Sequence, residues 1–92
     1  MQPYRESGLP QGHETKSTKN LAVTVTAATG KKLYITSIVN SHASTARTLT
    51  YKTPTTYTLD VAGSSSVSPA FPIVATEFTT PETDIAVIYV EA

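Results

Sequence analysis

Apolar and polar residues alternate with a period of two along most of this chain. In residues 21–27, Val23 and Val25 alternate with Thr24 and Thr26. Successive side chains of a β-strand point to opposite faces, so this pattern predicts a strand with one buried face. No stretch shows the 3.6-residue period of an amphipathic helix, and the strand-favouring residues Thr, Val and Ile dominate. The chain is therefore predicted to be all-β.

The same alternation predicts further strands, separated by segments rich in turn-forming residues. The expected strands are residues 33–39, 47–52, 57–61, 77–80 and 84–91. Residues 40–46 and 63–66 hold mostly small and polar side chains, which predicts loops. About six to eight short strands with regularly spaced turn signals are typical of a small antiparallel sandwich or barrel.

Two of these segments depart from a simple strand with one apolar face. Residues 33–39 are apolar on both faces, and strict alternation assigns Leu33 to one face and Tyr34 and Ile38 to the other. Residues 67–74 contain two prolines, which cannot donate to a strand ladder. That segment is therefore expected at a sheet edge or in an irregular crossing.

The first 20 residues have a different composition from the rest. Residues 1–20 are polar, are interrupted by Pro and Gly, and hold only two large apolar side chains, Tyr4 and Leu9. Such a segment cannot form a core, so we expect either an extended N-terminal arm or, on composition alone, a free tail. Fully extended, 20 residues reach at most about 66–70 Å, enough to cross onto a neighbouring subunit. We assign residues 1–20 to the arm and residues 21–92 to the sandwich domain.

The arm supplies the first candidate contacts with another chain. Tyr4 and Leu9 have no core of their own to join, and a Tyr side chain provides a large contact area at small entropic cost. The candidate partner-binding residues are Tyr4, Arg5, Leu9 and Pro10.

Charge and length narrow the classes of function. The chain has 92 residues, enough for one domain, and its seven Lys and Arg balance seven Asp and Glu. Nucleic-acid binding draws much of its affinity from cationic side chains that neutralise phosphates, so no nucleic-acid partner is expected. Residues 1–20 lack an apolar run, so neither a secretory signal nor a membrane span is expected there. Only 15% of residues are charged, which favours a surface partly covered by partners.

A search for catalytic or metal-binding residues finds weak candidates. The chain has only two histidines, His13 in the arm and His42 in a predicted loop, and His42 is expected to be a polar surface residue rather than part of a triad. Glu77, Glu82 and Asp84 lie close in sequence, but their spacing favours solvated charges over a glycosidase pair or a calcium site. The absence of Cys excludes thiolate ligands. We expect no enzymatic activity, no cofactor and no metal.

Lys31 and Lys32 lie at the tip of a predicted hairpin turn, Thr29-Gly30-Lys31-Lys32. A phosphate or nucleic-acid site would need interleaved aromatic residues or a Gly-rich loop that leads into a helix, and neither is present. Lysines at such a position also discourage edge-to-edge strand pairing. We keep Lys31 and Lys32 as candidate docking charges for acidic residues of a neighbour.

Three stretches of the chain resemble sequences of small virion structural proteins of tailed bacteriophages. They are residues 30–41 (GKKLYITSIVNS), 67–77 (VSPAFPIVATE) and 83–92 (TDIAVIYVEA). The resemblance implies a jelly-roll-like sandwich. The section between the second strand and the Pro-rich crossing is shorter here than in that group, which leaves a strand either missing or supplied by the arm.

The resemblance also implies a function. A capsid decoration or cement protein is the first expectation: it would bridge neighbouring capsid subunits, with the major capsid protein as its partner, at the capsid surface after synthesis in the host cytoplasm. A homo-oligomer is expected, and a trimer would suit local three-fold positions. The alternatives are a tail, baseplate or fibre-base component, or a module that binds a host glycan or receptor. The last would favour exposed aromatic residues in loops 40–46 or 63–66, which contain none.

Overall fold

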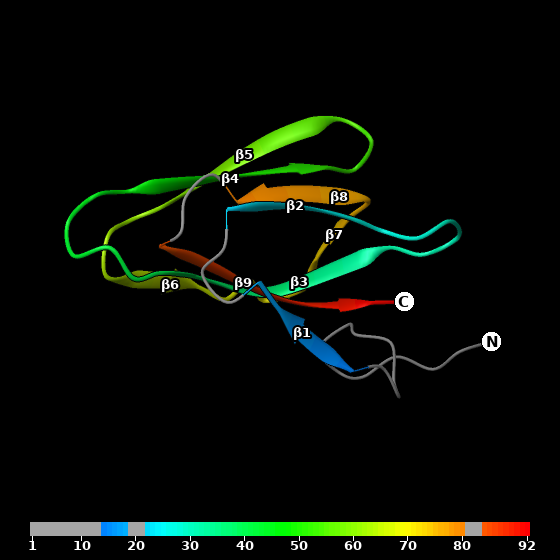
Figure 1. The fold of residues 1–92 in the computed structure, drawn as a ribbon, viewed down its shortest axis with the longest axis horizontal. Helices are drawn as coiled ribbons and strands as arrows, with labels where there is room; N and C mark the ends of the chain where they lie inside the picture. Colours follow the sequence, from blue (N-terminus) through cyan, green and yellow to red (C-terminus); the bar gives the residue numbers. More distant parts are fainter. Residues whose placement is uncertain (1–13, 19–21, 81–83) are drawn as a thin grey trace.

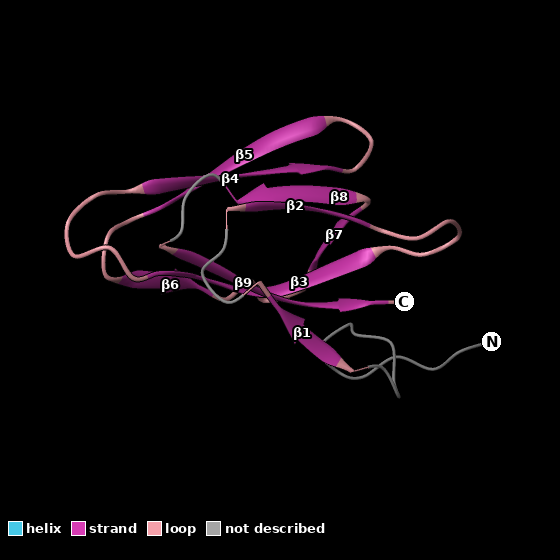
Figure 2. Cartoon of the chain, viewed as in Figure 1, coloured by secondary structure: helices cyan, strands magenta, loops and turns pink. Residues whose placement is uncertain are grey.

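The computed structural model describes residues 14–18, 22–80 and 84–92, and these residues form nine β-strands. The strands make two antiparallel sheets that lie face to face (Figure 1; Figure 2). The prediction of a small all-β antiparallel sandwich is therefore confirmed. The described residues include no helix, and so none that could span a membrane.

The two sheets have five and four strands. In the five-stranded sheet the order is β1 (Thr15–Ser17), β9 (Ile85–Glu91), β3 (Leu33–Asn40) and then β6 (Ser65–Val67) and β7 (Ile73–Ala75), which both pair with β3. In the four-stranded sheet the order is β2 (Val23–Thr26), β8 (Glu77–Thr80), β4 (Arg47–Lys52) and β5 (Thr56–Val61). The central strand β3 thus contacts three others, which makes it the organising element of the five-stranded sheet.

The core lies between the sheets and is built from the inward-facing side chains. Its fully buried members include Leu33, Ile35, Ile38, Leu49, Val61, Phe78, Ile85 and Val87. The ring of Phe78 on β8 meets Tyr89 on β9 edge-on, with 5.2 Å between the ring centroids. Each of the large side chains stabilises the fold by about 1.5–3 kcal/mol through burial. The alternation read from the sequence therefore identifies most of this core.

A β-bulge in β3 reverses one part of that alternation. The pairing of β3 with β9 shifts register between Ile35 and Ser37, where β3 contains one extra residue. After the bulge, Ile38 points into the core and is fully buried together with Ile35, whereas Tyr34 points to the opposite face. The prediction that Ile38 shares a face with Tyr34 is wrong for this reason.

Two short strands lie where the sequence predicted none. Strand β1 falls within the predicted arm, where it pairs with β9, and Thr18 continues the contact through a 3.0 Å hydrogen bond from Val87 N to its Oγ1. Strand β6 begins in the predicted loop 63–66. Residues 67–74 run along the sheet edge formed by β6 and β7, as their prolines predicted.

Candidate functional site

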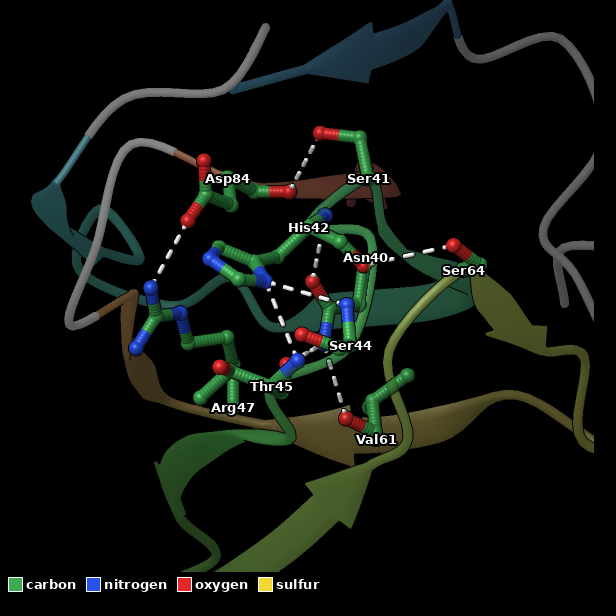
Figure 3. Close-up of polar contacts among 9 residues, drawn as sticks. All are labelled: Asn40, Ser41, His42, Ser44, Thr45, Arg47, Val61, Ser64 and Asp84. Carbon is green, nitrogen blue, oxygen red and sulfur yellow. Dashed lines mark hydrogen bonds and ion pairs between the residues drawn. The ribbon is translucent and has the colours of Figure 1, made fainter.

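Loops from both sheets meet at one end of the sandwich, where His42 is half-buried (Figure 3). His42 Nδ1 accepts hydrogen bonds from the backbone N–H groups of Ser44 (3.2 Å) and Thr45 (3.0 Å). A neutral ring that accepts at Nδ1 carries its proton on Nε2. Neither nitrogen is then prepared to accept a proton from a neighbouring hydroxyl, as a catalytic triad requires. The ring instead holds the backbone of its own loop.

The buried side chain of Asn40 also holds the loop that contains His42. It is 1% exposed, and its Nδ2 donates to the carbonyl oxygens of Thr45 and Val61, both at 2.9 Å. Its Oδ1 accepts a 3.0 Å hydrogen bond from the backbone N–H of His42. These partners fix the orientation of the amide, because two carbonyls need donors and one N–H needs an acceptor. Asn40 therefore satisfies polar groups from two loops at once.

The loop after β5 packs directly on the loop that contains His42. A Cβ atom added to Gly63 would lie 2.7 Å from the backbone carbon of Ser44, so only glycine permits this approach. The backbone N–H of Ser64 donates to the carbonyl oxygen of His42 at 2.7 Å, and Ser64 has a φ of 52°. The two loops thus form one unit, here called the loop cluster, composed of residues 40–47, 61–65 and 84.

Arg47 and Asp84 close the loop cluster on its other side (Figure 3). Arg47 Nη2 lies 2.9 Å from Asp84 Oδ2, which links the start of β4 to the residue that precedes β9 in the opposite sheet. The backbone N–H and the hydroxyl of Ser41 both donate to the carbonyl oxygen of Asp84, at 2.9 and 3.0 Å. The polar groups of the cluster are therefore mainly engaged in holding loops together.

The acidic residues considered for a shared site are separated by the fold. Glu77 pairs with Lys52 at the end of β4, with 3.0 Å between Oε2 and Nζ, whereas Asp84 pairs with Arg47 at its start. Five strand steps of about 3.3 Å put these ends about 16 Å apart. Hydrogen bonds from Lys52 and Thr26 hold the pKa of Glu77 below its usual value. Glu82 lies outside the described residues, among which no three His, Cys, Asp or Glu side chains are grouped to hold a metal.

The opposite end of the sandwich carries the two candidate docking charges. Lys31 and Lys32 are exposed at the turn between β2 and β3, where Gly30 adopts a φ of 80°. Backbone hydrogen bonds between Lys32 and Ala92, at 2.8 and 3.0 Å, fix the turn against the end of β9. Neither lysine side chain pairs with a described carboxylate. We call this exposed turn, residues 28–32, the lysine hairpin.

Glu91 supports the lysine hairpin from the neighbouring strand. Its Oε2 accepts a 2.8 Å hydrogen bond from the backbone N–H of Ala28, and its Oε1 lies 3.5 Å from Lys16 Nζ on β1. The bond from Ala28, with a smaller contribution from Lys16, lowers the pKa of Glu91. The carboxylate therefore ties β9 to both the hairpin and β1.

Some large apolar side chains remain exposed. Phe71, in the crossing between β6 and β7, is 72% exposed, and Tyr57 on the edge strand β5 is 48% exposed and stacks on Tyr51 with 5.6 Å between ring centroids. Aromatic side chains are enriched in protein interfaces. Sequence reasoning did not single out Phe71, although a Phe between two prolines at a sheet edge was a usable signal.

Of the sequence-predicted site residues, the structure describes Lys31 and Lys32 alone, because Tyr4, Arg5, Leu9 and Pro10 lie outside the described residues. Comparisons of the chain with protein-family models, with curated proteins and with solved structures found no match. The candidate site therefore rests on geometry: an exposed lysine hairpin at one end, a hydrogen-bonded loop cluster at the other, and exposed aromatic residues on the sheet edges.

Proposed function

We propose that this chain is a non-enzymatic virion structural protein that decorates and cements a bacteriophage capsid by bridging neighbouring capsid subunits. One observation carries the proposal: the three stretches that resemble phage virion proteins are neighbours in space. Residues 30–41 supply the lysine hairpin and β3, residues 67–77 supply the crossing to β7, and the last stretch supplies β9. Strand β3 pairs with β6, β7 and β9, so the resemblance extends over one continuous sheet.

The exposed side chains suit a protein that acts by burying surface. Phe71 and Tyr57 offer apolar contact area, and Lys31 and Lys32 offer charge that no described ion pair engages. A standard protein interface buries roughly 800 Å² on each partner. Weak individual contacts suffice on a lattice, because linked sites gain from a high effective concentration.

The proposed mechanism is mechanical. The sandwich docks on the shell, the two lysines orient it against acidic residues of the capsid protein, and the arm residues Tyr4 and Leu9 contact a neighbouring subunit. Surface buried between neighbours opposes their separation under the internal pressure of the packaged DNA. Binding to the folded form also stabilises this small domain by mass action.

Quantitative mass spectrometry of purified virions tests the proposal. The measured quantity is the copy number of this chain relative to the major capsid protein. A ratio near one, or a simple fraction of it, is the expected result for a protein that covers the shell. A far smaller ratio would move the chain to the tail, a vertex or a fibre, and absence from the virion would end the structural proposal.

A further inference from the structure

A straight row of four residues crosses the outer face of the five-stranded sheet, the face turned away from the core. The strand registers place Thr15 of β1 opposite Val90 of β9, Val90 opposite Tyr34 of β3, and Tyr34 opposite Val74 of β7. Three of its members point outward because their chain neighbours Ile35, Ala75 and Tyr89 belong to the core, and Thr15 is exposed. We call these four residues the outer row.

The outer row is mostly apolar and includes one buried side chain. Val90 is 1% exposed, although it lies outside the core cluster, and Val74 is 39% exposed. The two sheets are the only layers that the described strands form (Figure 1), and no described strand covers the outer face that carries the row. A buried valine on such a face calls for an apolar cover.

We propose that residues 1–13 of the same chain dock on the outer row, with Leu9 as the side chain that packs against Val74 and Val90. Besides Met1, this segment has two large apolar side chains, Tyr4 and Leu9, too few for a core of its own. The segment is also connected to one end of the outer row, because it precedes Thr15, the first member of the row, in the chain.

The length of the segment fits the width of the row. Leu9 precedes Thr15 by six positions, which span up to about 20 Å when extended. From β1 across β9 and β3 to β7 there are three strand spacings of about 4.8 Å, or about 14 Å. Leu9 therefore reaches every member of the row with chain to spare.

The tether favours the chain's own segment over a second copy. A short covalent connection gives an effective concentration on the order of millimolar, so a modest apolar contact is enough to keep the segment docked. A second copy would need to supply the same contact at its much lower solution concentration. The inference concerns the isolated chain and does not rest on the proposed function. On a shell, Leu9 would have to leave the outer row before it could contact a neighbouring subunit.

A paramagnetic label tests the docking in the full-length chain. The protein has no Cys, so Ser7→Cys gives a single attachment site two residues from Leu9. In ¹⁵N-labelled protein, we expect the amide signals of Tyr34, Val74 and Val90 to broaden relative to a diamagnetic label. Thr48 and Thr58 lie on the outer face of the other sheet, about 10 Å further away, and their signals should stay sharp.

Two controls make the result decisive. Leu9→Asp in the labelled chain should restore the three signals, whereas Leu9→Met should leave them broadened. In a mixed sample, ¹⁴N chain that carries the paramagnetic label is combined with ¹⁵N chain that lacks it. The signals of the ¹⁵N chain should not broaden. Three results would overturn the inference: uniform or absent broadening, broadening that persists in Leu9→Asp, and broadening in the mixed sample. The last would identify a second copy of the chain as the occupant.

Discussion

Asn40 Nδ2 donates a 2.9 Å hydrogen bond to the carbonyl oxygen of Val61, and so joins the last residue of β3 to the last residue of β5 in the opposite sheet. Because Asn40 is almost fully buried, water cannot replace this bond or the two others that its amide makes. A single side chain thus connects the sheets at the end where the loop cluster lies.

Replacing Asn40 should destabilise the whole domain. We expect Asn40→Ala to lower the free energy of unfolding by about 1–3 kcal/mol, because it leaves buried carbonyl and N–H groups unpaired. Chemical denaturation measures the change. Thr58→Ala, at an exposed position of β5, is the matched control and should change stability by less than about 0.5 kcal/mol. An Asn40→Ala protein as stable as the control would show that the three bonds contribute nothing net.

The bonds to His42 predict that it stabilises its loop. His42→Ala should raise the amide hydrogen-exchange rates of Ser44 and Thr45 roughly tenfold, because each loses its only described acceptor. His42→Asn should keep both rates near those of the wild type, because an Asn oxygen accepts bonds from backbone N–H groups two and three residues on. Exchange followed by NMR gives the rates residue by residue. Equal rates in all three proteins would remove the loop-holding role.

Much of the fold follows from the alternation of side chains, and its failures have local physical causes. The strands at residues 47–52 and 77–80 have the predicted bounds. In the first, Thr alternates with Leu49 and Tyr51, whereas the second has Phe78 as its one apolar side chain. Ile38 was assigned to the wrong face because one extra residue in a bulge reverses the alternation, and nothing in the local composition marks a bulge.

The two unpredicted strands share a different cause. Residues 15–17 are exposed and residues 65–67 are mostly serine, so neither shows an apolar face. They are strands because an edge of the five-stranded sheet offers backbone hydrogen bonds to them.

The contacts of the site could be predicted less well than the strands. The exposed position of Lys31 and Lys32 follows from a turn signal, which is local. The pairs of Arg47 with Asp84 and of Asn40 with Val61 join residues that are 37 and 21 positions apart. Only the packing of the two sheets brings these residues together, and one sequence does not encode that packing in any visible period.

Glu91 should make the stability of the domain depend on pH in the acid range. Its pKa is lowered in the folded state by the N–H of Ala28 and by Lys16, so the unfolded chain binds its proton at a higher pH than the folded chain does. Stability therefore rises with pH across that window. The contribution of Glu91 to the free energy of unfolding is complete above the ordinary carboxyl pKa of about 4.3. It is lost as the pH falls through the lowered pKa of the folded state.

Glu91→Gln isolates this contribution, because Gln keeps an acceptor for Ala28 but carries no charge. The variant should be less stable than the wild type at about pH 6, and the difference should shrink as the pH falls below the ordinary carboxyl value of about 4.3 and through the lowered pKa of Glu91. Denaturation midpoints at several pH values measure the effect. A difference that stays constant with pH would mean that the charge of Glu91 is not what stabilises the hairpin.

The lysine hairpin gives a prediction that bears directly on the proposed function. Reversing both charges, in Lys31→Glu with Lys32→Glu, should slow association with capsid shells that lack this chain by roughly tenfold at low salt, because charges at the rim of an interface act mainly on the association rate. Added salt should reduce the difference, since the screening length falls to about 8 Å at physiological ionic strength. The thermal midpoint should fall only slightly, because both side chains are exposed and the turn is held by backbone bonds, and the one described charge that the reversal would repel is Glu91. The neutral pair Lys31→Gln with Lys32→Gln should fall between the two. Identical association rates for all three proteins, with the shell still bound, would move the docking surface away from the hairpin and towards the edges that carry Tyr57 and Phe71.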